Sequence, residues 1–298
     1  MENEILRLHQ RFCDYSLTFK GNTPRTIQWY RSVISAFIRH TKLDKIESVT
    51  QGVIEGWILD KKLKNNWSAK TIRNNLQGIG LFFDWCVNQG FVQKHPTKDI
   101  PKPRLPKTLP KHLSKEESTT LLDWTRNFPY SYKFDRTRAV AVIATFMYTG
   151  IRLQELKNLK MTDVDLERHS LFVQCGKGEK DRNIPLNLHL LPILEEYLKD
   201  RKRLKKTCPY FFTAMRDDKR MGDLVIKRLI EKLRKKSGIY FYPHLLRHTF
   251  ATLMLEGGCD LFSLSKMMGH SDIKTTTIYL SATTAHLQEQ ILKHPLNF

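Results

Sequence analysis

The segment HLLRHTFATLMLEGGCDLFSLSKMMGHSDIKTTTIY, residues 244–279, has a helical apolar pattern interrupted by five residues that could do chemistry. An arginine binds a phosphate through paired donors and stays charged, and a histidine exchanges protons near neutral pH. A tyrosine becomes a nucleophile once a proton acceptor and a positive field assist it. Packing alone does not explain this combination of residues, which are His244, Arg247, His248, His270 and Tyr279.

Two earlier stretches carry single basic residues in unusual settings. TGIRLQEL, residues 149–156, places Arg152 just after a glycine that is expected to end a helix, and GKGEKDR, residues 176–182, places Lys177 between two glycines. Taken singly, each has an ordinary interpretation as a surface arginine or an exposed turn lysine. Tyr279 alone is likewise an ordinary tyrosine on an amphipathic helix.

A metal site is the alternative interpretation of the histidine pair, because His244 and His248 stand four residues apart. However, a metalloprotease motif requires a glutamate directly after the first histidine, and Leu245 stands there. The chain also has no cluster of carboxylates suited to a two-metal site. The sequence therefore predicts no metal.

The net charge indicates a polyanionic partner. The 298 residues are 41% hydrophobic and 27% charged, with a formal charge of +20 and an isoelectric point near 9.8. Nucleic acid is the first candidate for such a basic chain, and an anionic membrane surface is the rival. The sequence has neither a run of ~18 apolar residues nor a signal-peptide pattern. Five scattered cysteines without a C-x-x-C motif favour the reducing cytoplasm.

Residues 1–95 are predicted to form an all-helical, DNA-binding domain. Thr23 and Ser68 are expected to cap two helices, each with an apolar face at helical spacing. Four basic residues fall near the starts of these helices, where backbone N–H groups also favour phosphate. Each could simply be solvated, but as a set they are predicted to bind DNA: Arg25, Arg31, Lys70 and Arg73.

Residues 96–113 contain five prolines and are predicted to be a linker, because proline disfavours both helices and central strands. Both sides of it are basic, with net charges of +9 up to Pro110 and +11 after it, as expected if two domains touch one polyanion. Ser114 and Glu117 predict a capping box, and RAVAVIATFMYTG a buried central helix. Two β-type runs flank Gly176-Lys177-Gly178 and predict a hairpin. The predicted fold is mainly α with a small β-sheet.

Together and in order, the patterns TGIRLQEL, GKGEKDR, HLLRH and GHSDIKTTTIY resemble the signature of the tyrosine recombinase (phage integrase) family. The resemblance covers nearly the whole chain and is greatest to the Xer-type recombinases, with transposon and phage integrases as alternatives. It implies an N-terminal core-binding bundle and a catalytic domain over residues 114–284. It also implies that the tail, residues 285–298, docks on a neighbouring protomer.

The resemblance also implies the site and its roles. Two arginines would clamp the scissile phosphate, His244 would accept the proton of Tyr279, and His270 would donate a hydrogen bond to the phosphate. Lys177 would protonate the leaving 5′-oxygen. Glu155 is expected to orient Arg152, and His248 is expected either to pack or to hold a residue of the site in place. No cofactor, metal or ATP is expected, and the implied catalytic residues are Arg152, Lys177, His244, Arg247, His270 and Tyr279.

The implied activity is site-specific DNA recombination through a 3′-phosphotyrosyl intermediate and a Holliday junction. The expected partner is double-stranded DNA with paired inverted half-sites, bound by a homotetramer or by a hetero-oligomer with a paralogue, in the cytoplasm at the nucleoid. A non-catalytic DNA-binding regulator, an RNA- or membrane-binding protein and a type IB topoisomerase are the alternatives. The sequence leaves open whether chromosome dimers or mobile elements are the substrate.

Overall fold

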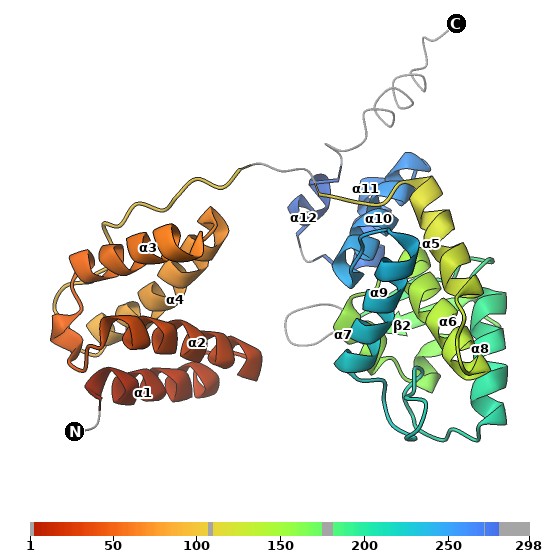
Figure 1. The fold of residues 1–298 in the computed structure, drawn as a ribbon, viewed down its shortest axis with the longest axis horizontal. Helices are drawn as coiled ribbons and strands as arrows, with labels where there is room; N and C mark the ends of the chain where they lie inside the picture. Colours follow the sequence, from red (N-terminus) through yellow and green to blue (C-terminus); the bar gives the residue numbers. More distant parts are fainter. Residues whose placement is uncertain (1–2, 107–109, 175–180, 271, 280–298) are drawn as a thin grey trace, which may run out of the picture. The chain divides into compact units, whose positions relative to one another are not determined.

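The computed structural model describes residues 3–106, 110–174, 181–270 and 272–279, and it divides into two compact units, Met1–Lys107 and Thr108–Phe298 (Figure 1). The predicted catalytic lysine Lys177 and the tail, residues 285–298, lie outside the described residues. Each unit has its own hydrophobic core.

The first unit is an all-helical bundle. Four side chains accept a hydrogen bond from the first turn of the helix that follows them, which satisfies a backbone donor that the helix leaves unpaired. Thr23, with Pro24 at the first helical position, and Ser68 are caps, as predicted; Asn3 and Thr50 are the other two. The helices are α1 (Glu4–Thr18), α2 (Pro24–Thr41), the short 3-10 helix η1 (Ile46–Ser48), α3 (Gln51–Asn65) and α4 (Ala69–Asn88).

Aromatic rings fill the centre of this bundle. Phe12 on α1 lies against Tyr30 on α2 and Phe82 on α4, with ring centroids 5.0 and 5.7 Å apart. The ring of Trp57 on α3 meets that of Phe37 edge to face at 5.3 Å. Burying such large rings, together with the aliphatic residues around them, removes much apolar surface from water and stabilises the bundle.

The second unit is mainly helical, with one small sheet, as predicted. Its helices and strands, in chain order, are α5 (Lys115–Asn127), α6 (Lys133–Thr149), α7 (Leu153–Asn158), η2 (Met161–Asp163), β1 (Val164–Asp165), β2 (Ser170–Val173), β3 (Arg182–Pro185), α8 (Leu191–Arg203), α9 (Asp223–Ser237), α10 (Pro243–Glu256), α11 (Leu261–Met268) and α12 (Lys274–Thr277).

Helix α6 is the buried centre of the second unit. It packs against α5, α8 and α10, and nearly every residue from Ala139 to Met147 is buried, as the all-round apolar sequence predicts. The helix ends at Gly150, whose φ of 60° is in the left-handed region. A Cβ at Gly150 would collide with the ring of Phe250 on α10, so both the conformation and the packing require glycine.

The sheet is antiparallel with the order β1-β2-β3. In the β2–β3 pair, Leu171 lies opposite Ile184 and Val173 opposite Arg182. Leu171, Val173 and Ile184 are buried, so one face of the sheet covers the core. The two strands are those predicted to flank Gly176-Lys177-Gly178, while the connection, residues 175–180, lies outside the described residues.

The described part of the proline-rich segment has no helix or strand over residues 101–106 and 110–114. Its end is fixed to the second unit: Leu113 is buried, and its backbone N–H donates to Thr249 Oγ1 on α10 at 2.9 Å. The capping box of Ser114 and Glu117 then starts α5, as predicted. In the basic run at residues 201–206, Arg201 is buried and donates to the backbone carbonyls of Cys208 and Tyr210.

Candidate active site

Arg152 is positioned by the turn between α6 and α7. It is the N-cap residue of α7, where its backbone N–H donates to Glu155 Oε2 at 2.8 Å and its Nη1 donates to Glu155 Oε1 at 2.9 Å. Its Nη2 also donates to the backbone oxygen of Gly269 at 3.3 Å. The Arg152 side chain remains about 29% exposed. One carboxylate therefore fixes an arginine that solvent, and hence a ligand, can reach.

Arg182, at the start of β3, is a second arginine on the same carboxylate. Its Nη1 and Nη2 donate to the two oxygens of Glu155 at 3.0 and 2.7 Å, and its Nε donates to Met267 O at 2.8 Å. The sequence reasoning gave Arg182 no role, although it ends the quoted GKGEKDR motif. Burial alone would raise the pKa of Glu155, but the hydrogen bonds and charges of Arg182 and Arg152 hold it at about 2.

Arg247 on α10 is almost completely buried and is held by backbone carbonyls. Its Nη1 donates to Gly150 O and its Nη2 to Met268 O, each at 2.6 Å. Both oxygens belong to the C-terminal ends of helices, α6 and α11, where the helix dipole is negative. Burial, followed by repulsion from Arg152, lowers the pKa of the Arg247 guanidinium to about 10. It is therefore still a cation at neutral pH.

His270 follows α11 and meets both Arg247 and the segment that carries Tyr279. Its Nε2 is 3.1 Å from Arg247 Nη2, and its Nδ1 is 2.8 Å from the hydroxyl of Thr276. Burial, then the charges of Arg247 and other arginines, lower the pKa of His270 to about 4. The ring is therefore neutral at neutral pH.

Tyr279 is buried, and its hydroxyl meets His248 rather than His244. The distance from Tyr279 Oη to His248 Nδ1 is 2.7 Å, while His244 contacts the ring of His248 with centroids 4.5 Å apart. His248 was expected to pack or to support the site, and here it contacts the Tyr279 hydroxyl directly. Burial raises the pKa of Tyr279, and the positive charges of Arg247 and Arg152 oppose that rise.

His244 is exposed at the start of α10. Partial burial of its ring, then the charges of Arg247 and Arg152, lower its pKa. Because both arginines act on both His244 and Tyr279, five predicted residues occupy one region of the second unit: Arg152, His244, Arg247, His270 and Tyr279. Lys177 lies outside the described residues.

The predicted DNA contacts on the first unit have different surroundings. Arg25 and Lys70 are exposed in the first turns of α2 and α4. Arg31 lies further along α2 than predicted and donates to Gln10 Oε1 at 3.1 Å. Arg73 is half-buried, with its Nη1 3.5 Å from the backbone oxygen of Pro103.

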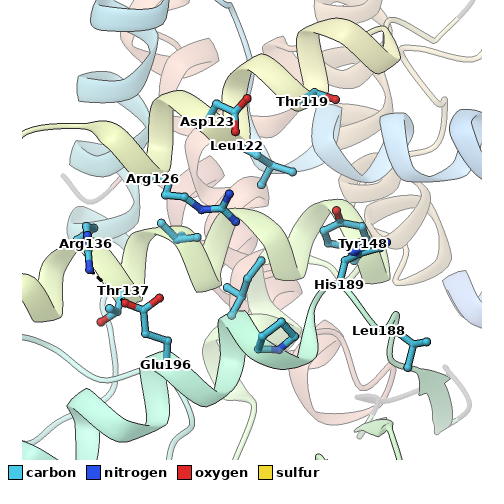
Figure 2. Close-up of a pocket in the computed structure, with 13 residues that line it drawn as sticks. Thr119, Leu122, Asp123, Arg126, Arg136, Thr137, Tyr148, Leu188, His189 and Glu196 are labelled. Atoms are coloured by element: carbon cyan, nitrogen blue, oxygen red, sulfur yellow. Dashed lines mark hydrogen bonds and ion pairs between the residues drawn. The ribbon is translucent and has the colours of Figure 1, made fainter.

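Neither a metal cluster nor a membrane-spanning helix is found within the described ranges. No group of three or more His, Cys, Asp or Glu side chains there could hold an ion, and no helix there is long and apolar enough to cross a bilayer. A hollow of about 620 Å³ opens between α5, α6 and α8 (Figure 2). The Arg136–Glu196 ion pair lies at its edge, and none of the candidate site residues line it.

Comparison with known protein families gives two matches that together span most of the chain. Residues 111–286 match the model described as "Phage integrase family", and residues 8–91 match "Phage integrase, N-terminal SAM-like domain". A curated relative, tyrosine recombinase XerA of Pyrococcus horikoshii, is 31% identical over 289 residues, covering 96% of this chain and 93% of the relative.

Two solved structures are similar over nearly the whole chain. The crystal structure of XerA recombinase is 29% identical, with a TM-score of 0.55, and the match covers 98% of this chain and 100% of that one. XerH site-specific recombinase bound to palindromic difH substrate is 20% identical, with a TM-score of 0.76 and coverage of 97% and 84%. The second similarity concerns the fold alone.

Proposed function

Because this chain belongs to the phage integrase family and is a tyrosine-type site-specific DNA recombinase, we propose that Tyr279 is the nucleophile that cuts the DNA strand. The observation that carries this assignment is the convergence of two arginines on one tyrosine. The charges of Arg247 and Arg152 both act on the Tyr279 phenol, and His270 Nε2 is 3.1 Å from Arg247 Nη2.

Arg152 and Arg247 form the phosphate clamp. Attack on a phosphodiester adds negative charge to the non-bridging oxygens, and fixed donors in a water-poor site stabilise that charge best. Arg247 is held by two carbonyls and Arg152 by Glu155, so neither has to be ordered by the substrate. His270 lies beside Arg247, from which its Nε2 accepts. To donate to the phosphate, as the family resemblance implies, this nitrogen would have to carry the hydrogen once the phosphate takes over the Arg247 donor.

Two side chains, His244 and Lys177, account for the protons that move in the transfer step. The Tyr279 oxygen bonds to phosphorus while the bond from phosphorus to the 5′-oxygen breaks. The phenol proton goes to His244, and Lys177 supplies a proton to the leaving 5′-oxygen. The resulting 3′-phosphotyrosyl bond keeps the energy of the phosphodiester, so rejoining by a 5′-hydroxyl reverses the same step without ATP.

The partners are DNA and further copies of a recombinase. Exposed Arg25 and Lys70 would contact phosphates from the first unit, and Arg31 and Arg73 complete the set predicted from the sequence. The finer arrangement that we propose is a tetramer on two duplexes with paired inverted half-sites, formed by this chain alone or with a paralogue. In a cell, such a protein would lie in the cytoplasm at the nucleoid.

A covalent-trapping experiment tests the nucleophile. The substrate is a duplex selected from random DNA by the wild-type protein and then nicked near the cleavage position, so that the cut fragment diffuses away. Tyr279→Phe should bind this duplex with unchanged affinity and form no adduct. An adduct with Tyr279→Phe would show that another residue attacks.

The proposed role of Lys177 as the general acid is tested separately with a 5′-bridging phosphorothiolate substrate, whose sulfur leaves without protonation. Lys177→Ala should cut the ordinary duplex slowly and the sulfur duplex at close to the wild-type rate. Equal defects on both substrates would remove Lys177 from the role of acid.

A further inference from the structure

His248 is within hydrogen-bonding distance of the Tyr279 hydroxyl, and the transfer step proposed above gives it no role. His248 Nδ1 is 2.7 Å from the phenol oxygen, and the two rings are tilted by 54° with centroids 5.5 Å apart. The Tyr279 side chain packs in a small apolar cluster that includes Phe250, Leu264 and Met268. The ring is therefore held on its apolar sides, and His248 sets the direction of the hydroxyl.

The other two histidines have different neighbours. Both ring nitrogens of His270 are engaged, one with Arg247 and the other with Thr276. His244 is exposed and meets His248 edge to face. Of the three, only His248 hydrogen-bonds to the Tyr279 hydroxyl among the contacts of the described residues.

His248 is poorly suited to keep the proton that Tyr279 loses. Arg247, His244 and His112 all act on its ring as positive or potentially positive neighbours, and burial adds to their effect. Burial first, and these charges second, lower the pKa of His248 to about 4. An imidazolium is disfavoured there, so His248 is a neutral ring with one N–H.

The position of that N–H decides what the contact can do during the reaction. If Nδ1 carried no hydrogen, its lone pair would face the oxygen of the phenolate once the proton had left, and the contact would become repulsive. If Nδ1 carries the hydrogen, it donates to the phenol oxygen before the attack and to the phenolate during it. The phenol hydrogen then stays available to His244.

We propose that His248 is a positioning residue for the nucleophile, a neutral Nδ1–H tautomer that donates to Tyr279 Oη and stabilises it as a phenolate. This role rests on the proposed function of Tyr279 as the attacking group. Hydrogen bonds to charged groups are stronger than neutral ones, so the contact gains strength as the proton leaves. A side chain that only filled space would gain nothing at that moment.

The tautomer can be measured without DNA. In the full-length protein with ¹⁵N-labelled histidine, the ring nitrogens of His248, assigned from the signals that disappear in His248→Asn, distinguish a protonated Nδ1 from a bare one at pH 7. We expect Nδ1 to carry the hydrogen. A hydrogen on Nε2 alone would overturn the proposal, whatever the identity of the nucleophile.

Three substitutions test the effect on the reaction with the nicked duplex described above. His248→Ala removes the donor, His248→Asp supplies only an acceptor, and His248→Asn places an amide donor near the position of Nδ1. Adduct formation should slow by about 10- to 100-fold in His248→Ala and at least as much in His248→Asp. His248→Asn should recover most of the rate, and all three should bind the duplex with the wild-type affinity.

The outcomes separate this proposal from the function on which it rests. A wild-type or faster rate in His248→Ala, or an Asn variant as slow as the Asp variant, would overturn the positioning role while leaving Tyr279 as the nucleophile. Thermal melting of each variant identifies one that does not fold. If His248→Ala does not fold, the comparison of Asn with Asp still decides the question. An adduct formed by Tyr279→Phe would instead refute the proposed function itself.

Discussion

Replacing Glu155 with glutamine should destabilise the second unit, called the catalytic unit below because it carries the candidate active site, and the effect should depend on pH. The carboxylate is about 10% exposed and accepts hydrogen bonds from both Arg152 and Arg182. These contacts outweigh the effect of burial and lower the pKa of Glu155 from 4.5 to about 2. Because each tenfold change in proton affinity is worth ~1.4 kcal/mol, the difference between 4.5 and about 2 corresponds to roughly 3 kcal/mol of stability at neutral pH.

The sign follows from the depressed pKa. The contribution of Glu155 is present in full above the unfolded-state value of 4.5 and is lost as the pH falls toward the folded-state value of about 2. Glutamine cannot ionise and leaves two arginines without their anion. The variant should therefore be less stable than the wild type by roughly 3 kcal/mol at pH 7, and the difference should shrink as the pH falls from about 5 to about 3.

Urea unfolding of the catalytic unit at pH 7, 5 and 3.5 measures this difference. Glu195→Gln is the matched control, because Glu195 is exposed on α8. Its stability should follow that of the wild type at every pH. A gap between wild type and Glu155→Gln that is the same size at pH 3.5 as at pH 7 would refute the assigned role of the carboxylate.

Three further results are expected. Gly150→Ala should lower the melting temperature of the second unit, because the added Cβ collides with Phe250. Gly222→Ala, where a Cβ meets open space, should leave the melting temperature nearly unchanged. Equal melting temperatures for the two variants would show that Gly150 is not required by packing. In the Arg25→Ala, Lys70→Ala double variant, the slope of log K for DNA binding against log salt concentration should become shallower by about 2, because each lost phosphate contact removes ~0.9 from the slope. An unchanged slope would show that neither residue contacts a phosphate. Truncation after Thr284 should leave binding to one half-site intact but abolish cooperative binding to paired half-sites, and retained cooperativity would contradict docking of the tail on a neighbour.

Patterns of local origin could be predicted from the sequence. Thr23, Ser68 and the Ser114–Glu117 capping box are the start signals of helices, and the structure places helices directly after them. The all-apolar stretch before Gly150 is the buried helix α6. Each of these features depends on residues a few positions apart in the chain, so it can be recognised from the amino-acid sequence alone.

Contacts between distant segments could not be predicted in the same way. Arg182 and Glu155 are 27 positions apart, and His248 and Tyr279 are 31 apart. The sequence indicated roles for Glu155, His248 and Tyr279 but none for Arg182. The pairing of these side chains depends on how α7, β3, α10 and the segment after α11 pack. The sequence could not decide between packing and support of the site for His248, because spacing within α10 does not show which residue lies across from it.

Because backbone carbonyl oxygens hold Arg247, its position should tolerate substitutions of the residues that supply those oxygens as long as the backbone stays in place. A side-chain ligand disappears with a single substitution, whereas the backbone oxygens of Gly150 and Met268 are present whatever residue occupies the position. Only a change that moves the backbone can remove them, and the left-handed glycines at 150 and 269 are where such a change would act. Among the residues whose backbone holds Arg247 and their immediate neighbours, we therefore expect random mutagenesis to yield inactive variants at Gly150 and at Gly269, while Met268 accepts other apolar side chains of similar volume.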